Sequence, residues 1–217
     1  MQWPLLADLP PEQVRELLQT ARRRTFARNE VVFHHSDPGD TLHLISKGRF
    51  AIRIMTPLGE TATLAVRGPG DSFGEMALFS EDSRRSATVC ALEEGETFSV
   101  RCPDFKHVRS QHPLVNQVLI RFLTKELRTL NDRFLEALYV PVERRVLRRL
   151  VELARLYGNG DQEVVIPLTQ EVLAEMAGTS RATVNRVLNE EQERGSLSLR
   201  RGKTVIRDVD GIGRRAR

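Results

Sequence analysis

Two short stretches of the sequence carry the residues best suited to bind a small anion. They are Phe73-Gly74-Glu75-Met76-Ala77-Leu78 and, after a short acidic insert, Arg84-Arg85-Ser86-Ala87-Thr88. A phosphodiester carries one negative charge and accepts hydrogen bonds, so it suits guanidinium groups, a hydroxyl and free backbone N–H groups. A ribose hydroxyl needs an acceptor such as Glu75, and glycine at position 74 permits a close backbone approach. Together these residues predict a site for a ribose-phosphate.

A plainer interpretation of the two arginines is also open. Arg84 and Arg85 could form a solvated pair with Glu81 and Asp82 on a surface loop, because short motifs also occur by chance.

The same two stretches resemble the phosphate-binding cassette of the cyclic AMP receptor protein family of bacterial transcription regulators, the Crp/Fnr family. The resemblance implies that Glu75 holds the ribose and that Arg85 and Ser86 hold the cyclic phosphate. It implies cyclic AMP, or a related cyclic nucleotide, as an effector, and no other cofactor. The cassette residues expected at the ligand are Gly74, Glu75, Met76, Ala77, Arg85, Ser86 and Ala87.

The positions that would recognise the base depart from the family pattern. In the best-known member a Thr-Ser pair on the long helices of both subunits binds the adenine amino group, and the matching positions here are Leu130 and Asn131. Asn131 can donate and accept at a purine edge, whereas Leu130 cannot. Cyclic AMP is the first choice of ligand, and another cyclic nucleotide or a regulator without an effector stays open.

Composition indicates a globular protein, and the distribution of charge favours a nucleic-acid partner, although so small a basic excess is also explained by solubility alone. The chain has 217 residues and a net charge of +4; residues 1–140 hold 18 Lys and Arg and 18 Asp and Glu, so the whole excess lies in the last third. A basic C-terminal part suits DNA phosphates. No apolar run approaches the roughly 18 residues of a membrane span, and the N-terminus does not resemble a signal peptide, which predicts a cytoplasmic protein without a membrane partner.

Cysteine and histidine usage indicates neither a disulfide framework nor a metal site. Cys90 and Cys102 are too few for a scaffold of disulfides and are expected to be reduced. The five histidines show no metal-ligand spacing with them and are interpreted as ordinary surface or strand residues. No Walker A, His-Glu-x-x-His or Gly-x-Ser-x-Gly motif is present, so we do not expect an enzyme.

The N-terminal half has the pattern of a β-sandwich or roll. A short amphipathic helix is predicted over Pro11–Thr20. Apolar segments then alternate with glycine and proline turns, which is typical of short strands. The predicted strands cover 31–33, 42–45, 50–55, 61–66, 88–92 and 97–100.

A long helix follows, beginning at Pro113 and ending near Leu138. Its apolar residues recur every three or four positions, and its length is about 40 Å at 1.5 Å per residue. Such a helix is too long to be covered by a small roll, so we predict a parallel two-helix seam and a homodimer. Packing of the stripe within its own chain is the alternative. The stripe comprises Leu119, Leu123, Leu127, Leu130, Phe134 and Leu138.

The segment from Gln170 to Leu188 predicts a helix-turn-helix. Ala174 lets two helices approach, and Gly178 permits the tight turn. Thr169 and either Thr179 or Ser180 are expected as N-caps. The predicted shared core comprises Leu173, Ala177, Val184 and Val187.

A basic hairpin from Leu197 to Ile206, turning at Gly202, makes this domain winged. In the family the residues that match Arg181 and Arg186 read guanines, and the glutamate that usually follows the first arginine is Ala182 here. Alanine could contact only a thymine methyl, so the half-site sequence is left open. The expected DNA-binding residues are Thr169, Gln170, Ser180, Arg181, Thr183, Asn185, Arg186, Arg201 and Lys203.

The predicted fold class is α+β, with three parts in order. A jelly-roll-like cyclic-nucleotide-binding β-roll occupies residues 1–112, a dimerisation helix residues 113–138, and a winged helix-turn-helix residues 139–217. The segment 140–142, with Pro141, is expected to act as a hinge. We expect the last five residues, Gly213–Arg217, to be a disordered basic end.

The predicted function is a homodimeric transcription regulator that binds double-stranded DNA at a palindromic operator and acts on RNA polymerase. Two alternatives from other classes stay open, a nucleotide-binding regulatory subunit and a nucleoid-type DNA-bending protein.

Overall fold

The computed structural model describes residues 3–6, 9–78, 84–112, 114–158 and 163–217, and it divides into two compact units. The first unit contains residues 1–54 and 64–130, and the second contains residues 55–63 and 131–217.

The first part of the chain forms η1 (Pro4–Leu6), α1 (Pro11–Thr20), β1 (Arg22–Phe26), β2 (Val31–Phe33), β3 (Thr41–Lys47), β4 (Phe50–Met55), β5 (Thr61–Arg67), β6 (Ser72–Phe73), η2 (Glu75–Leu78), β7 (Thr88–Ala91), β8 (Gly95–Arg101), α2 (Cys102–Gln111) and α3 (Leu114–Tyr139).

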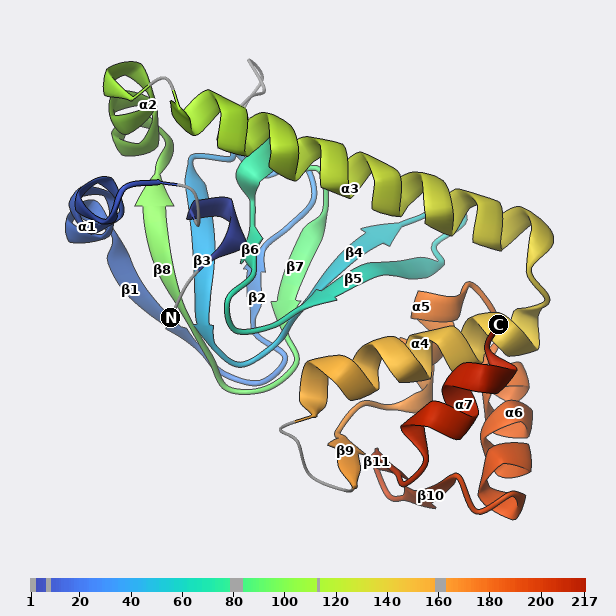
Figure 1. Cartoon of the computed structure of the whole chain (residues 1–217). Helices are drawn as coiled ribbons and strands as arrows, with labels where there is room; N and C mark the ends of the chain where they lie inside the picture. The colour runs from blue at the N-terminus through green and yellow to red at the C-terminus, as the bar shows by residue number, and fades with distance from the viewer. Residues whose placement is uncertain (1–2, 7–8, 79–83, 113, 159–162) are drawn as a thin grey trace. The chain divides into compact units, whose positions relative to one another are not determined.

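The strands form the two sheets of a roll, one in the order β1-β8-β3-β6 and the other in the order β2-β7-β4-β5 (Figure 1). Successive side chains of a strand point to opposite faces, so β3 places Leu42 and Leu44 outward and His43 and Ile45 inward. Phe26, Phe50 and Phe73 pack between the sheets with Ile45. The predicted roll is therefore confirmed.

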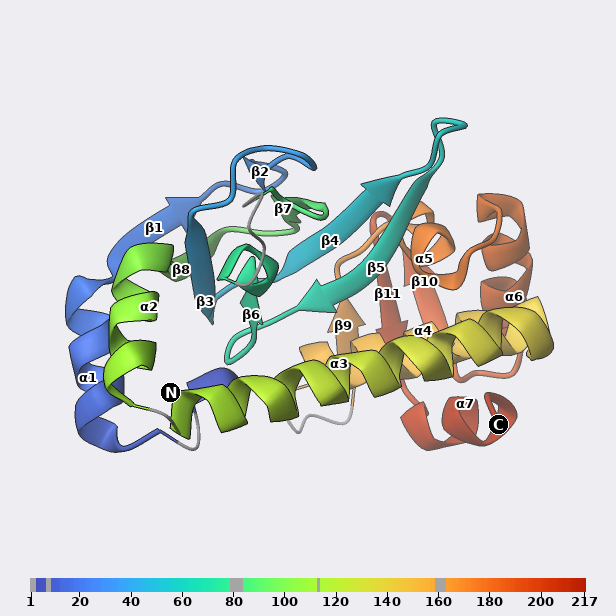
Figure 2. The same ribbon diagram turned by 90° about the horizontal axis from the view of Figure 1, so that it is seen from above.

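A second apolar core covers the outer face of the first sheet. The helices α1 and α2 lie side by side there (Figure 2), and Leu17, Phe105 and Leu44 are among the buried residues that join them to the sheet. Trp3 anchors the N-terminal segment, because its Nε1 donates to the carbonyl oxygen of Ile45 at 3.0 Å. This layer fixes the roll as a rigid support for its loops.

The long helix α3 is buried only over its first turns. Val115, Val118 and Leu119 belong to the outer core, whereas the apolar residues from Leu123 onward are exposed. Pro113, the predicted first residue of this helix, lies outside the described residues. Helix α3 ends at Tyr139, and Pro141 then occupies the N-cap of the next helix.

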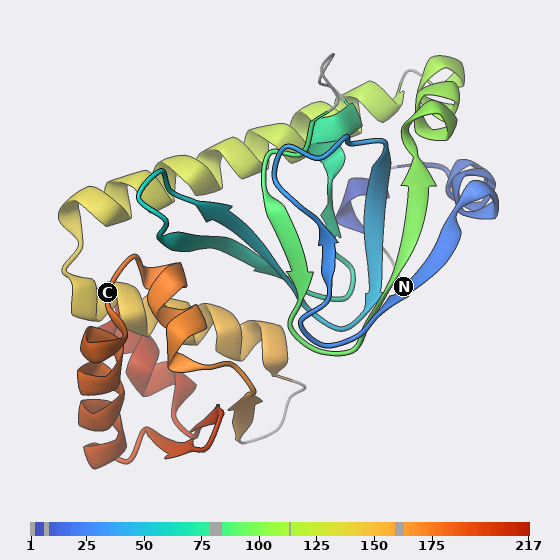
Figure 3. The same ribbon diagram turned by 180° about the vertical axis from the view of Figure 1, so that it is seen from behind.

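The second unit contains the winged helix-turn-helix. Its elements are α4 (Val142–Tyr157), β9 (Val164–Ile166), α5 (Gln170–Ala177), α6 (Arg181–Glu193), β10 (Leu197–Arg200), β11 (Lys203–Ile206) and α7 (Val209–Arg215). The strands pair in the order β10-β11-β9, and the wing turns at Gly202, which has a φ of 73° (Figure 3, orange to red).

Helices α5 and α6 meet as predicted. Gly178 adopts the left-handed conformation with a φ of 60°, and the four predicted core residues are all buried. Ser180, rather than Thr179, caps α6, since its hydroxyl accepts from the N–H of Thr183 at 3.2 Å. The helix-turn-helix prediction is confirmed.

The prediction of a disordered tail over Gly213–Arg217 is wrong. Helix α7 extends to Arg215, and Asp208 caps it by accepting from the N–H of Gly211 at 2.8 Å. Arg215 donates from Nε to Oε1 of Glu191 at 3.0 Å, and Glu191 is only 1% exposed. A charge-assisted pair with a buried carboxylate thus orders a segment whose composition alone indicates disorder.

Within the described ranges, none of the helices combines the length and apolarity that a bilayer crossing needs.

Candidate nucleotide site and DNA-binding face

The turn into the predicted cassette requires glycine. Gly74 has a φ of 82°, which side chains rarely tolerate. A Cβ at this position would lie 2.7 Å from Nη1 of Arg85 and 3.0 Å from the carbonyl oxygen of Thr41. Glycine therefore lets the backbone and the buried guanidinium come together, in addition to making the turn.

Arg85 is buried in the roll, with 5% of its surface exposed. Its Nη1 donates to the carbonyl oxygen of Thr41 at 2.7 Å and to that of Gly74 at 3.4 Å, and its Nη2 donates to Oγ1 of Thr41 at 2.8 Å. The guanidinium carbon lies 4.0 Å from the centre of the Phe33 ring. A carboxylate oxygen of Asp40 is 3.9 Å away. Arg85 is thus held by internal acceptors and an aromatic face.

Glu75, the second ionisable residue of the cassette, begins the short helix η2. Burial raises the pKa of its carboxyl group, while its own backbone N–H and the Arg67 and Arg85 guanidiniums act in the opposite direction. Arg67 in turn pairs with Glu126 of α3 at 2.6 Å. A buried carboxylate gains from a hydroxyl that donates to it.

The structure brings Gly74, Glu75 and Arg85 into one wall of the roll, and it places the other predicted ligand residues differently. Ala87 is buried just before β7, whereas the side chains of Met76 and Ser86 are exposed. Ala77 lies on η2, and Asn131 is exposed on the part of α3 that belongs to the second unit.

The alternative pairing of the arginines falls partly outside the described residues, because Glu81 and Asp82 are not described. Arg84 donates from Nη1 to the carbonyl oxygen of Ser36 at 2.9 Å. Arg85 is not a solvated side chain, as its burial shows.

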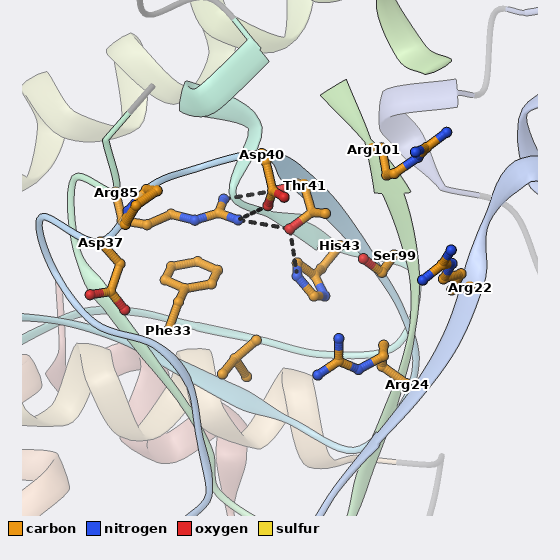
Figure 4. Close-up of a pocket in the computed structure, with 12 residues that line it drawn as sticks. Arg22, Arg24, Phe33, Asp37, Asp40, Thr41, His43, Arg85, Ser99 and Arg101 are labelled. Carbon is orange, nitrogen blue, oxygen red and sulfur yellow. Dashed lines mark hydrogen bonds and ion pairs between the residues drawn. The ribbon is translucent and has the colours of Figure 1, made fainter. Parts of the chain in front are cut away.

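A pocket of about 390 Å³ adjoins Arg85 (Figure 4). Thr41, Phe33 and His43 line it and were not predicted as site residues. His43 is buried and stacks on Phe73 with ring centres 4.9 Å apart. Burial, with smaller effects from Arg85 and Arg24, lowers the pKa of His43 to about 3, so its ring is neutral at physiological pH. The inward alternation of Thr41, His43 and Ile45 along β3 is the sequence signal that could have indicated Thr41 and His43.

Five of the nine predicted DNA-binding residues, Thr169, Gln170, Arg181, Asn185 and Lys203, line a groove of about 460 Å³ between the helix-turn-helix and the wing. Arg181 and Asn185 line it from α6, and Lys203 lines it from the wing. Thr169 caps α5 through Val172, and Gln170 accepts from Nδ2 of Asn185 at 3.3 Å. Ser180 and Thr183 form the start of α6, and Arg201 is exposed at the tip of the wing.

Arg186 differs from Arg181 because acidic neighbours hold it. Its Nη2 lies 2.6 Å from Oε1 of Glu143, and its Nη1 lies 2.9 Å from Oε1 of Glu190. These exposed pairs raise the pKa of Arg186. The guanidinium is therefore available to a new partner only in competition with two carboxylates.

Among the described residues, no group of three or more His, Cys, Asp or Glu side chains is arranged to hold a metal ion. Cys90 and Cys102 are buried and are not joined in a disulfide.

Comparison with protein-family models assigns both parts of the chain. Residues 23–112 match the cyclic nucleotide-binding domain, and residues 144–215 match the Crp-like helix-turn-helix domain.

Two relatives match nearly the whole chain. The chain is 30% identical to the CRP-like cAMP-activated global transcriptional regulator of Mycobacterium tuberculosis, over 98% of this chain and 96% of the relative. It is 32% identical to the cyclic AMP receptor protein of Thermus thermophilus, over 95% and 93% of the two chains.

Solved structures show the same fold. The Thermus thermophilus catabolite activator protein aligns with a TM-score of 0.57 at 30% identity, covering 98% of each chain. The c-di-GMP responsive regulator CLP of Xanthomonas campestris aligns with a TM-score of 0.77 at 22% identity, covering 91% of this chain and 99% of that one.

Proposed function

Because the chain belongs to the Crp/Fnr family of bacterial transcription regulators, we propose that it acts as a homodimer whose binding to a palindromic operator is controlled by a cyclic nucleotide. Cyclic AMP is the proposed effector. The observation that carries this proposal is the placement of half-buried Glu75 and buried Arg85 in one wall of the roll.

The carboxylate of Glu75 and the guanidinium of Arg85 match the two halves of a ribose cyclic phosphate. The Glu75 carboxylate would accept from the ribose hydroxyl, which compensates for its burial. Arg85 would donate to the phosphate, and the exposed hydroxyl of Ser86 would add a second donor. Because Arg85 is engaged by Thr41, the phosphate would have to compete for its N–H groups.

Cyclic AMP is favoured over other cyclic nucleotides by the relatives, since those in Mycobacterium and Thermus are named for it. Asn131 would bind the purine edge, since its amide both donates and accepts. Leu130 lacks that capacity and would contribute to the helix seam instead.

The dimer would form along α3. Leu127, Leu130 and Phe134 are 58%, 63% and 63% exposed, although they lie on a helix of 26 residues with apolar residues at steps of three and four. A contiguous apolar stripe of this kind marks an interface. A second copy of the same helix is the complementary partner.

The operator would be read by the paired α6 helices. Arg181 would donate a bidentate pair of hydrogen bonds to a guanine, as would Arg186 once released from its carboxylates. Arg201 and Lys203 of the wing would contact phosphates. A ligand at the α3 seam would rotate the winged helix-turn-helix about residues 140–142, so that the two α6 helices come about 34 Å apart, one turn of DNA. The bound dimer would recruit or block RNA polymerase.

Calorimetry with cyclic AMP tests the nucleotide site. Ser86→Ala should weaken binding about tenfold because it removes one charge-assisted donor from an exposed position, and Arg85→Ala should abolish binding. Arg84→Ala is the matched control and should bind like the wild type. Undiminished affinity in both the Ser86 and the Arg85 variants would remove the assignment of the cassette.

Footprinting with and without cyclic AMP tests the control of DNA binding. We expect protection of a discrete palindrome only when the nucleotide is present. Protection of the same palindrome without any nucleotide would identify an effector-independent regulator, and diffuse protection would identify an architectural DNA-binding protein.

A further inference from the structure

The pocket beside Arg85 has a charge distribution that no step of the proposed function uses. Two carboxylates, Asp37 and Asp40, lie at the Arg85 end, and three guanidiniums, from Arg22, Arg24 and Arg101, lie at the other end (Figure 4). The carboxylate of Asp37 already accepts a hydrogen bond within its own loop, from the N–H of His34 at 2.8 Å. The arginine end is therefore the electropositive part of the pocket.

The arginines converge because of strand alternation. Arg22 and Arg24 are two residues apart on β1, so both point to the face of the sheet that carries Phe26 into the roll. β8 pairs with β1 in a register that sets Arg22 opposite Ser99, and Arg101 follows two residues later. The pairing of β1 and β8 thus places the three positive charges of Arg22, Arg24 and Arg101 along one side of the same pocket.

Two of these arginines have no carboxylate partner. Arg101 pairs with Asp104 at 2.9 Å, but neither Arg22 nor Arg24 forms an ion pair with any residue in the described part of the chain. Like charges held close together repel one another, and an anion that binds between them lowers this electrostatic repulsion. The neighbouring Arg23 points away from the pocket and pairs with Glu96.

The walls supply the remaining features of a ligand site. Ser99 and His43 are buried polar residues of the lining, and Phe33 and Val32 provide apolar surface. The Nε–H of Arg85, which is 95% buried, has no acceptor among the described residues. The volume of about 390 Å³ exceeds what a single inorganic phosphate fills and lies in the usual range of small-molecule pockets.

We propose that this pocket binds a small organic anion, a phosphate or carboxylate attached to an apolar group, separately from the cyclic nucleotide. Arg22 and Arg24 would hold the anionic group together with the hydroxyl of Ser99. The apolar group would lie against Phe33. All of these residues belong to the first unit, so the site is complete within one roll.

Calorimetric titration of the full-length protein with phenyl phosphate at low ionic strength tests the proposal, with inorganic phosphate as a second probe. The wild type should bind phenyl phosphate more tightly than inorganic phosphate, and the double variant R22A/R24A should lose at least tenfold in affinity. R23A, which removes one exposed arginine from the same strand, is the matched control and should bind like the wild type. Both arginines are exposed, so the variants should fold.

A repeat of the titration in the presence of saturating cyclic AMP separates the two sites. Binding that persists, and still depends on Arg22 and Arg24, supports the proposal. Three results would overturn it: no binding of phenyl phosphate, equal losses in R23A and R22A/R24A, or complete displacement by cyclic AMP. The last result would make the pocket part of the nucleotide site.

Discussion

At the scale of single residues, the acidic neighbours of Arg186 predict a limit on DNA affinity. Glu143 lies 2.6 Å from the Arg186 guanidinium and would also repel DNA phosphates. We expect Glu143→Gln to raise operator affinity two- to fivefold, since an exposed ion pair is worth about 0.2–1 kcal/mol. Fluorescence anisotropy at fixed salt would measure the change.

The control for this prediction is Glu163→Gln, which removes the same charge from an exposed pair with Arg207. An equal gain in affinity for this variant would attribute the effect to net charge rather than to the release of Arg186.

His43 predicts a specific pH dependence of stability. Its pKa is about 3 in the folded protein and 6.5 in the unfolded chain, because burial and the nearby Arg85 and Arg24 disfavour the charged ring. The unfolded state therefore binds one more proton between these values, and the folded state loses stability as the pH falls below 6.5. When the pH falls from 6.5 to 5.5, the titration of His43 should lower the free energy of unfolding by about 1 kcal/mol.

Chemical denaturation of the wild type and of His43→Asn at the two pH values would test this expectation. The variant, which has no titrating ring at this position, should lose about 1 kcal/mol less than the wild type over that interval. His107→Asn changes an exposed histidine and should keep the wild-type slope. A slope in His43→Asn equal to that of the wild type would contradict the assignment.

At the scale of elements, a cluster of charges connects the last turns of α3 to α4. Glu136 accepts two hydrogen bonds from Nη2 of Arg149, at 2.9 and 3.0 Å, and pairs with Arg148 at 3.2 Å. Arg149 is buried and also pairs with Glu152. These contacts hold the last turns of α3 against α4, across the proline that separates the helices.

Glu136→Ala should therefore destabilise the junction by about 2 kcal/mol, because it leaves a buried guanidinium with one partner fewer. Thermal unfolding monitored by circular dichroism would measure the loss. Asp132→Ala removes an exposed carboxylate one turn earlier on α3 and should leave the midpoint unchanged. Equal stability of both variants would show that the cluster is only a surface feature.

The elements with a strong apolar period could be predicted from the sequence, and those with charged faces could not. Strands 31–33 and 50–55 and helix 11–20 were predicted with the observed bounds. β1 was missed because three successive arginines conceal the alternation that ends in buried Phe26. Helix α7 was missed because its order depends on the distant Glu191, which local composition does not reveal.

The candidate site, like the fold, could be predicted from the sequence only in part. The order Gly-Glu followed by Arg-Ser predicts which residues form the cassette wall, and Gly74, Glu75 and Arg85 do lie together. The acceptors that hold Arg85, chiefly Thr41, come from a strand 44 residues earlier. Only the register of the folded sheets brings them into contact, so spacing along the chain gives no signal for them.

At the scale of the whole molecule, the exposed stripe of α3 predicts the assembly. Leu127 lies at the centre of the stripe and is 58% exposed. A glutamate at this position would place two like charges in the seam of a dimer, where they would be desolvated and would repel each other. We expect Leu127→Glu to sediment as a monomer at concentrations where the wild type is a dimer.

Arg128→Glu reverses a charge on the next residue of α3, which a helix turns about 100° away from the stripe, and should remain dimeric. The monomeric variant should keep the wild-type circular dichroism spectrum, because Leu127 makes no contribution to the buried cores of the described residues. It should also lose the advantage of two half-sites, so its affinity for a palindrome should approach its affinity for a single half-site. An intact dimer in Leu127→Glu would place the subunit interface elsewhere and leave the α3 stripe without its proposed partner.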